Sequence, residues 1–278
     1  MRFLLILSIM AGLLAFGPSV NAEDVASHRA LVLAVSEGTS GGIDSETALK
    51  KYKALADMIG KALQTRVSLV FVREFAQLEE GMQKQRFDIV MARPSDYPAR
   101  GVRDYGYHFI ATADPAGHCE LIVPKNSPLR SVKDLKGRYF IFPEKQAYMT
   151  RFCRAALRDE GIALDDAHVF YVREQGAIPF SLKNGIADVG GVASYSGAYT
   201  KWLESGQRVL YESRAQPYFP VIASSAVDEK QRKQIQDALT GMGATATGQN
   251  ELGILSIKGF VTTDEDRFSK LLSWLAVD

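Results

Sequence analysis

The sequence predicts an α/β protein with two Rossmann-like lobes, a ligand cleft and a hinge between them. Short apolar runs alternate with segments of helical periodicity, and this alternation is typical of a parallel sheet covered by helices. The order strand, loop, helix, strand, helix, strand occurs twice along the chain. The segments that join the two halves are short. The simplest architecture consistent with this pattern is two lobes with a cleft between them.

The first 22 residues have the features of a secretory signal. Arg2 supplies the positive charge, Phe3–Phe16 forms the apolar core, and Val20-Asn21-Ala22 fits a small-residue cleavage site. The alternative is a membrane anchor, but the apolar run is short for a bilayer span and no stop-transfer flank follows it. We expect cleavage after Ala22 and a soluble protein exported to the periplasm.

The rest of the chain is balanced in charge. The full sequence has 33 basic and 32 acidic residues, and loss of Arg2 brings the formal net charge to zero. No basic stripe is present, so neither nucleic-acid binding nor electrostatic membrane docking is supported. The 4 histidines lie outside the known catalytic and metal-binding motifs. We therefore predict a binding protein without cofactor or metal, and not an enzyme.

The first half of the chain alternates strands and helices. Leu31–Val35 is a compact apolar run, which predicts a buried strand, and the glycine-rich loop Ser36–Gly42 follows it. Apolar residues at helical spacing predict an amphipathic helix over Glu46–Leu63. The next predicted elements are a strand at Val67–Val72, a helix at Phe75–Gln85, a strand at Phe87–Ala92, a loop or short helix over Arg93–Gly101 and a strand at His108–Ala113.

The segment His118–Gly161 is predicted to carry the chain from one lobe to the other. After its first strand come a helical turn at Ser131–Gly137, a strand at Arg138–Phe142 and the loop Pro143–Tyr148, which would face the cleft. An amphipathic helix follows. The remaining predictions are strands at His168–Val172, Ala187–Val192, Arg208–Tyr211 and Phe219–Ala223, and helices at Ala177–Asn184, Ser194–Gly206, Asp228–Met242, Thr247–Leu255 and Thr263–Ala276.

Three segments resemble the type 2 periplasmic binding proteins. SVKDLKGRYFIF (131–142) resembles their DLKGK-strand signature. FDIVMARPSDY (87–97) and LKNGIADVGGVASY (182–195) resemble two segments of the phosphate/phosphite/phosphonate-binding, PhnD-like subfamily. The match follows the family's order from about Ala30 to Val277. It implies a periplasmic solute-binding protein that closes its hinge on an oxyanion or phosphonate-like ligand for an ABC importer.

The domain organisation expected from this resemblance has three parts. Residues 1–22 are the signal peptide, residues 23–116 form lobe one, and residues 117–214 form lobe two. The C-terminal segment, about 215–278, returns to lobe one. We expect a monomer.

One loop departs from the subfamily. Phosphonate binders carry a Ser-Thr-Ser-Gly type sequence after the DLKG strand, and its hydroxyls and N–H groups hold an oxyanion. This chain has Pro143-Glu144-Lys145-Gln146-Ala147-Tyr148 instead. The hydroxyl cluster is missing and an acidic residue is present, so membership of the family does not define the ligand as a phosphonate.

Candidate ligand-binding residues follow the predicted strands. They are Glu37, Gly38, Thr39, Arg93, Tyr97, Gln146, Ala147, Tyr148, Ser194 and Tyr195. Tyr97 holds the position where an aromatic hydroxyl reaches the ligand in the family, and Arg93 could pair an anionic group bidentately. The alternatives are simple packing for Tyr97, a salt bridge for Arg93 and a helix cap for Ser194. Arg173 and Glu174 either bind ligand or bridge the lobes.

Both cysteines, Cys119 and Cys153, lie in the crossover segment. In an exported protein they form a disulfide or remain two buried thiols. A third interpretation follows from the resemblance, because arsenite-sensing relatives use a cysteine for a soft ligand, and Cys119 could do so here. The partner is either an ABC permease or the periplasmic domain of a sensor kinase, and the sequence does not distinguish the two. A periplasmic enzyme is a more distant alternative.

Overall fold

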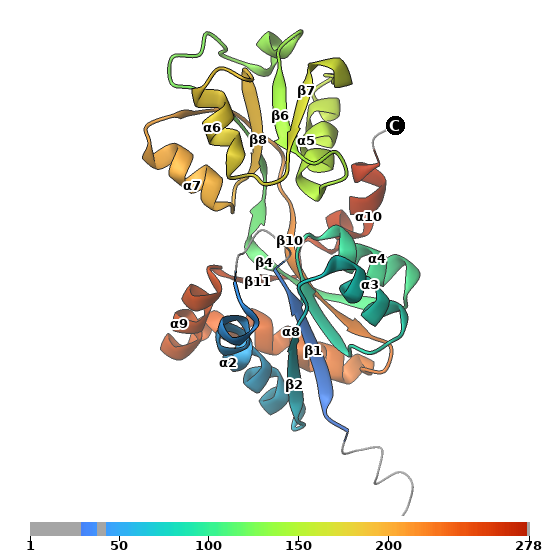
Figure 1. The fold of residues 1–278 in the computed structure, drawn as a ribbon. Coiled ribbons are helices and arrows are strands. Elements are labelled where there is room, and N and C mark those ends of the chain that lie inside the picture. The colour runs from blue at the N-terminus through green and yellow to red at the C-terminus, as the bar shows by residue number, and fades with distance from the viewer. Residues whose placement is uncertain (1–28, 38–42, 277–278) are drawn as a thin grey trace, which may run out of the picture.

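The computed structural model describes residues 29–37 and 43–276. The predicted signal peptide and the candidate residues Gly38 and Thr39 lie outside the described residues. In the described part of the chain, no helix combines the length and the apolar character that crossing a membrane requires. These residues fold into two α/β lobes, which Figure 1 shows one above the other.

The sheet of lobe one has six strands in the order β11-β4-β10-β3-β1-β2. Its parallel half consists of β1 (Leu31–Ser36), β2 (Val67–Phe71) and β3 (Ile89–Ala92). Its antiparallel half consists of β4 (Tyr107–Gly117), β10 (Gln216–Ser224) and β11 (Gly259–Val261). A wholly parallel sheet is therefore the wrong expectation. Strand β10 returns from lobe two and runs against its neighbours, a feature that alternation of elements does not encode.

Helices cover both faces of this sheet. Helix α2 (Ser45–Leu63) begins after Asp44, whose side chain accepts a hydrogen bond from the Thr47 N–H at 2.9 Å. Helix α8 (Glu229–Thr240) begins after Asp228, whose side chain caps it by accepting a hydrogen bond from the Gln231 N–H. The other helices of lobe one are α3 (Phe75–Gln83), α4 (Asp96–Asp104), η4 (Met242–Ala244), α9 (Ala246–Leu255) and α10 (Glu265–Leu275).

The sheet of lobe two has five strands in the order β7-β6-β8-β5-β9. They are β5 (Cys119–Val123), β6 (Phe140–Pro143), β7 (Val169–Val172), β8 (Val189–Ala193) and β9 (Arg208–Glu212). Its helices are η2 (Val132–Leu135), α5 (Tyr148–Asp159), η3 (Asp166–His168), α6 (Ala177–Lys183) and α7 (Gly197–Glu204). Strands β6, β7 and β8 run parallel, so their carboxyl ends share one edge of the sheet.

Two extended segments cross between the lobes, from β4 to β5 and from β9 to β10 (Figure 1). The His118 N–H donates to the Ser194 hydroxyl at 3.1 Å, and the Cys119 N–H donates to the Ser213 hydroxyl at 2.9 Å. Helix α10 adds a third link, because Arg158 of α5 donates to the Trp274 carbonyl at 2.6 Å. The hinge therefore joins the lobes through two strands and is flanked by a helix that contacts both.

A disulfide joins Cys119 of β5 to Cys153 of α5, with 5.3 Å between the Cα atoms. Both residues are fully buried. The bond attaches α5 to the sheet of lobe two, and Gly191 makes room for it, because a Cβ atom there would lie 2.9 Å from the Cys153 sulfur. Cys119 therefore presents no thiol to the cleft, and its candidate role toward a soft ligand does not fit this structure.

Several element boundaries differ from the prediction. Strand β11 was not expected, since three residues are too few for a periodic signal. Strand β10 begins at Gln216, three residues before the predicted strand Phe219–Ala223. Helix α7 is capped by Ser196 and not by Ser194. The two strands are defined by hydrogen-bonding partners that lie far away in sequence. The start of α7 is defined by its cap residue.

Candidate functional site

A cleft of about 690 Å³ lies between the lobes. Lobe one contributes Glu37, Phe75 and Arg93 to its wall. Lobe two contributes residues 147–149, 173–176 and 195–198, which follow strands β6, β7 and β8. Ligands of open α/β sheets bind at the carboxyl ends of the strands, and the volume is typical of a site for a small molecule.

The N-terminus of α5 opens on this cleft. Its cap residue is Ala147, which makes no side-chain capping hydrogen bond. The first N–H groups of an α-helix have no acceptor within the helix, and together with the helix dipole they attract anions. The loop lacks the hydroxyl cluster expected of the phosphonate binders, so the groups that it offers to an anion are the backbone N–H groups of α5.

Positive side chains outnumber negative ones around the cleft. The cations in its wall are Arg93, Arg173, Lys183 and Lys201, and the anions are Glu37 and Glu174. Glu37 is already shared between Arg93 and Lys51. Arg173, Lys183 and Lys201 form no ion pair with any residue that the structure describes. An excess of positive charge in a concave site favours an anionic ligand.

Glu37 and Arg93 form a buried ion pair at the lobe-one wall. Glu37 is 4% exposed, and its Oε2 accepts a hydrogen bond from Arg93 at 2.6 Å. Its Oε1 accepts bonds from Lys51 at 2.7 Å and from the Tyr52 hydroxyl at 2.5 Å. Burial raises the pKa of Glu37, but the bonds from Lys51 and Tyr52 and the charge of Arg93 outweigh it and hold that pKa below its ordinary value.

Arg93 also reaches the strand that returns from lobe two. Its Nη1 donates to the Tyr218 hydroxyl at 2.8 Å, and its buried Nε has no partner among the described residues. Tyr218 stacks on Tyr195 of lobe two, with 4.2 Å between ring centroids. Gly117 of the first crossing segment lies beside this stack, because a Cβ atom there would come within 2.9 Å of the Tyr195 ring. Arg93 is thus linked to both lobes.

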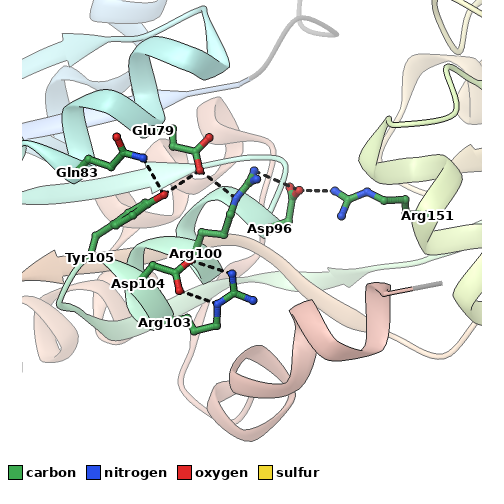
Figure 2. A network of polar contacts seen from close by, with 8 residues as sticks. All are labelled: Glu79, Gln83, Asp96, Arg100, Arg103, Asp104, Tyr105 and Arg151. Carbon is green, nitrogen blue, oxygen red and sulfur yellow. Dashed lines mark hydrogen bonds and ion pairs between the residues drawn. The ribbon is translucent and has the colours of Figure 1, made fainter. Parts of the chain in front are cut away.

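A second polar network joins the lobes beside the cleft (Figure 2). Arg100 of α4 lies between Glu79 at 3.4 Å and Asp96 at 3.6 Å. Asp96 is 2% exposed and also pairs with Arg151 of α5. The first turn of α5, which faces the cleft, is therefore held to lobe one by this ion pair.

The structure brings about half of the candidate residues together. Glu37, Arg93, Ala147, Tyr148 and Tyr195 all lie in the wall of the cleft. The other described candidates lie elsewhere: Tyr97 stacks on Phe75, Gln146 is exposed outside the wall, Ser194 binds the His118 N–H, and Cys119 is in the disulfide.

Nothing in the sequence marks some of the wall residues as candidates for ligand binding. Phe75 reads as an ordinary helix start, and Lys183, Lys201 and Trp202 read as parts of helices. Their place in the cleft depends on how α3, α6 and α7 dock on the sheets. Arg173 and Glu174, noted only as following a strand, also line the cleft.

A second cavity, of about 460 Å³, lies beside the hinge and contains two neighbouring carboxyl groups. Glu120 of β5 pairs across the strands with Glu212 of β9. Glu120 is 1% exposed, and its Oε2 has no partner among the described residues. Burial, the charge of Glu212 and a hydrogen bond with it raise the pKa of Glu120 to about 7. In the described residues, no cluster of potential metal ligands is present.

This raised pKa predicts a pH-dependent stability. Between the ordinary pKa of 4.5 and about 7, folded Glu120 keeps a proton that the unfolded chain has lost, so stability falls as pH rises through this window. Glu120→Gln keeps a neutral side chain at every pH. We expect it to raise the free energy of unfolding at pH 8 by about 2 kcal/mol, less than the full shift implies because the cavity admits water.

Urea unfolding of both proteins at pH 4 and pH 8 measures this difference. At pH 4 the two curves should nearly coincide, since Glu120 is protonated in both states. Glu204→Gln, at the exposed end of α7, serves as the control and should change little at either pH. Equal gains at both pH values would show that ionisation of Glu120 is not the cause.

Two lobes, two crossing strands and a cleft at the strand ends define a two-lobed solute-binding protein. The family model described as "ABC transporter, phosphonate, periplasmic substrate-binding protein" matches residues 42–268. The chain belongs to this family, and it is a solute-binding protein of an ABC importer. The family is periplasmic and binds substrates, and its members bind small ligands and interact with permeases. The resemblance seen in the three sequence segments is confirmed.

Solved structures share the fold at low sequence identity. XAC2383 from Xanthomonas citri bound to ATP is 14% identical, with a TM-score of 0.66, over 88% of this chain and 96% of that chain. PhnD1 from Prochlorococcus marinus in complex with methylphosphonate is 14% identical, with a TM-score of 0.64, over 87% and 96%. The aliphatic sulphonate binding protein SsuA from Escherichia coli is 17% identical, with a TM-score of 0.60, over 88% and 82%. No curated protein matched the sequence.

Proposed function

We propose that the protein captures an oxyanion-bearing solute in the cleft between its lobes. The observation that carries this proposal is the uncapped N-terminus of α5, which faces the cleft together with Arg93 and an excess of positive side chains. The anionic group would accept hydrogen bonds from the first N–H groups of α5. A guanidinium N–H of Arg93 would bind the same group from lobe one.

Binding from both walls explains how the ligand would close the hinge. An anion held only by α5 would touch one lobe and would not favour closure. An anion that also binds Arg93 interacts better with the closed form, and a ligand shifts a conformational equilibrium only by such differential affinity.

The finer assignments of location and partner belong to the same proposal. We place the mature protein, residues 23–278, in the periplasm as a monomer that does not catalyse a reaction. Residues 23–116 and about 215–278 form lobe one, and residues 117–214 form lobe two. The partner is an ABC permease that recognises the closed form. A sensor kinase is the alternative partner, and co-purification with each membrane protein distinguishes them.

A thermal-shift screen tests the proposal. The purified mature chain is titrated with phosphate, phosphite, methylphosphonate, arsenite, small sulfonates and small carboxylic acids, with potassium chloride at equal ionic strength as control. A ligand at a hundred times its Kd stabilises a protein by about 2.7 kcal/mol, so a binder should raise the melting temperature by several degrees. We expect stabilisation by one or more oxyanions. Stabilisation by uncharged solutes alone would overturn the proposal.

A further inference from the structure

Phe75 is an aromatic side chain in the wall of a charged cleft. It is the first residue of α3 in lobe one, and its ring is only half buried. Helix α3 packs on lobe one through Leu78, Gly81 and Met82. The packing of the helix therefore does not require an aromatic residue at position 75, and the exposed part of the ring faces the cleft.

Two further side chains support the Phe75 ring. Its ring stacks on Tyr97, with 4.8 Å between centroids and 20° between planes. Arg100 lies over the same tyrosine, with its guanidinium carbon 4.2 Å from the ring centroid. Tyr97 itself is not part of the cleft wall. The tyrosine that was expected to bind ligand thus supports the aromatic residue that does line the cleft.

The base of this stack is fixed by ion pairs. Figure 2 shows Arg100 between Glu79 and Asp96, and it shows Asp96 paired with Arg151 of lobe two. Glu79 also accepts a hydrogen bond from the Tyr105 hydroxyl at 3.0 Å. A ring held in this way loses little conformational freedom when a ligand contacts it, which is the condition for a favourable stacking surface.

The size of the cleft points to the same kind of ligand. An inorganic oxyanion bound at α5 and Arg93 would occupy a small part of the 690 Å³. Much of the remaining wall is apolar, with Phe75 in lobe one and Pro179 and Trp202 in lobe two. Apolar walls around a few fixed polar groups are typical of sites for organic molecules.

We propose that Phe75 determines specificity by stacking on a planar group of the ligand, so that the solute is an organic anion with an aromatic or similarly flat body. This inference rests on the proposed function, since the anionic group is the part held by α5 and Arg93. It adds that the neighbouring part of the ligand lies against Phe75, whose orientation Tyr97 and Arg100 maintain.

Calorimetric titration with matched pairs of anions tests the inference. The probes are methyl-, cyclohexyl- and phenylphosphonate, with the corresponding sulfonates and carboxylates. The phenyl compound should bind about tenfold more tightly than the methyl compound and severalfold more tightly than the cyclohexyl compound, because aromatic pairs gain free energy beyond area burial. Phe75→Leu keeps apolar volume without a π-face, so it should remove the preference of phenyl over cyclohexyl.

Phe180→Ala provides the matched control. Phe180 is 65% exposed on α6 and does not line the cleft, so its removal should leave all three affinities unchanged. If all three headgroup series bind without preference for phenyl, or if Phe75→Leu keeps the preference, the inference is wrong while the proposed function stands. If no anion of any series binds to the unaltered protein and no inorganic oxyanion of the thermal-shift screen stabilises it, the proposed function fails and the inference fails with it.

Discussion

Replacement of Arg93 by alanine is expected to weaken anion binding by about 2 kcal/mol, which corresponds to roughly thirtyfold in Kd. The same change should lower the free energy of unfolding by about 3 kcal/mol, because it removes one of the two cations that pair with the buried Glu37. Glu37 would keep Lys51 and Tyr52 as partners, so the loss should be at the lower end for a buried pair. Calorimetric titration and urea unfolding measure the two effects.

Two further variants separate binding from folding. Arg93→Lys keeps the charge beside Glu37 but loses the planar fork, so it should recover stability better than affinity. Arg103→Ala removes an exposed arginine whose partner is the adjacent Asp104, and it should change neither quantity by more than about 0.5 kcal/mol. Unchanged affinity in a folded Arg93→Ala protein would show that Arg93 is structural and does not bind the ligand.

The double variant Cys119→Ala/Cys153→Ala is expected to lose about 3 kcal/mol of the free energy of unfolding. The disulfide closes a loop across 34 positions, and a cross-link of this span restricts the unfolded chain by an amount of that order. Because the bond lies within lobe two and away from the cleft wall, ligand affinity in the folded protein should be unchanged. Urea unfolding and calorimetric titration give the two numbers.

Reduction of the unaltered protein serves as the comparison for the disulfide variant. Reduction breaks the same bond without removing side-chain volume from the core. The free energy of unfolding of the reduced protein should therefore lie between those of the oxidised protein and the double variant. Two free thiols in the untreated, folded protein would contradict the disulfide. A large loss of affinity for a thiophilic ligand in the double variant would instead support the hypothesis that Cys119 binds a soft ligand.

The parallel strands of lobe one could be predicted from the sequence, but the antiparallel strands could be predicted only in part. The parallel strands β1, β2 and β3 were expected, because each is a short apolar run separated from the next by an amphipathic helix. The antiparallel strand β10 and the three-residue β11 depend on partners far away in sequence. Such pairing carries no local periodicity. The sequence therefore does not predict the short strand β11, and it predicts β10 only from Phe219 onward.

The candidate site shows the same division. Glu37 and Tyr195, which line the cleft, were selected by the rule that ligands bind at the carboxyl ends of strands. Tyr148 was selected from the family resemblance, and Arg93 from its ability to pair an anion beside Tyr97. Tyr97 also follows a strand, but it lies in α4, where its ring is used to support Phe75. Which way a side chain points from a helix depends on how that helix docks, and one sequence does not contain this information.

The sequence by itself determined the class of this protein, because apolar periodicity, the predicted export signal and three short segments in a fixed order are local features. It also located the loop at which the chain departs from the phosphonate binders. Only the tertiary structure decided the character of the cleft, since Phe75, Lys183, Lys201 and the pair of Glu37 with Arg93 come from separate segments. Charged and aromatic side chains interact with a ligand over only a few ångströms, and the packing of the two lobes determines which of them come that close to one another.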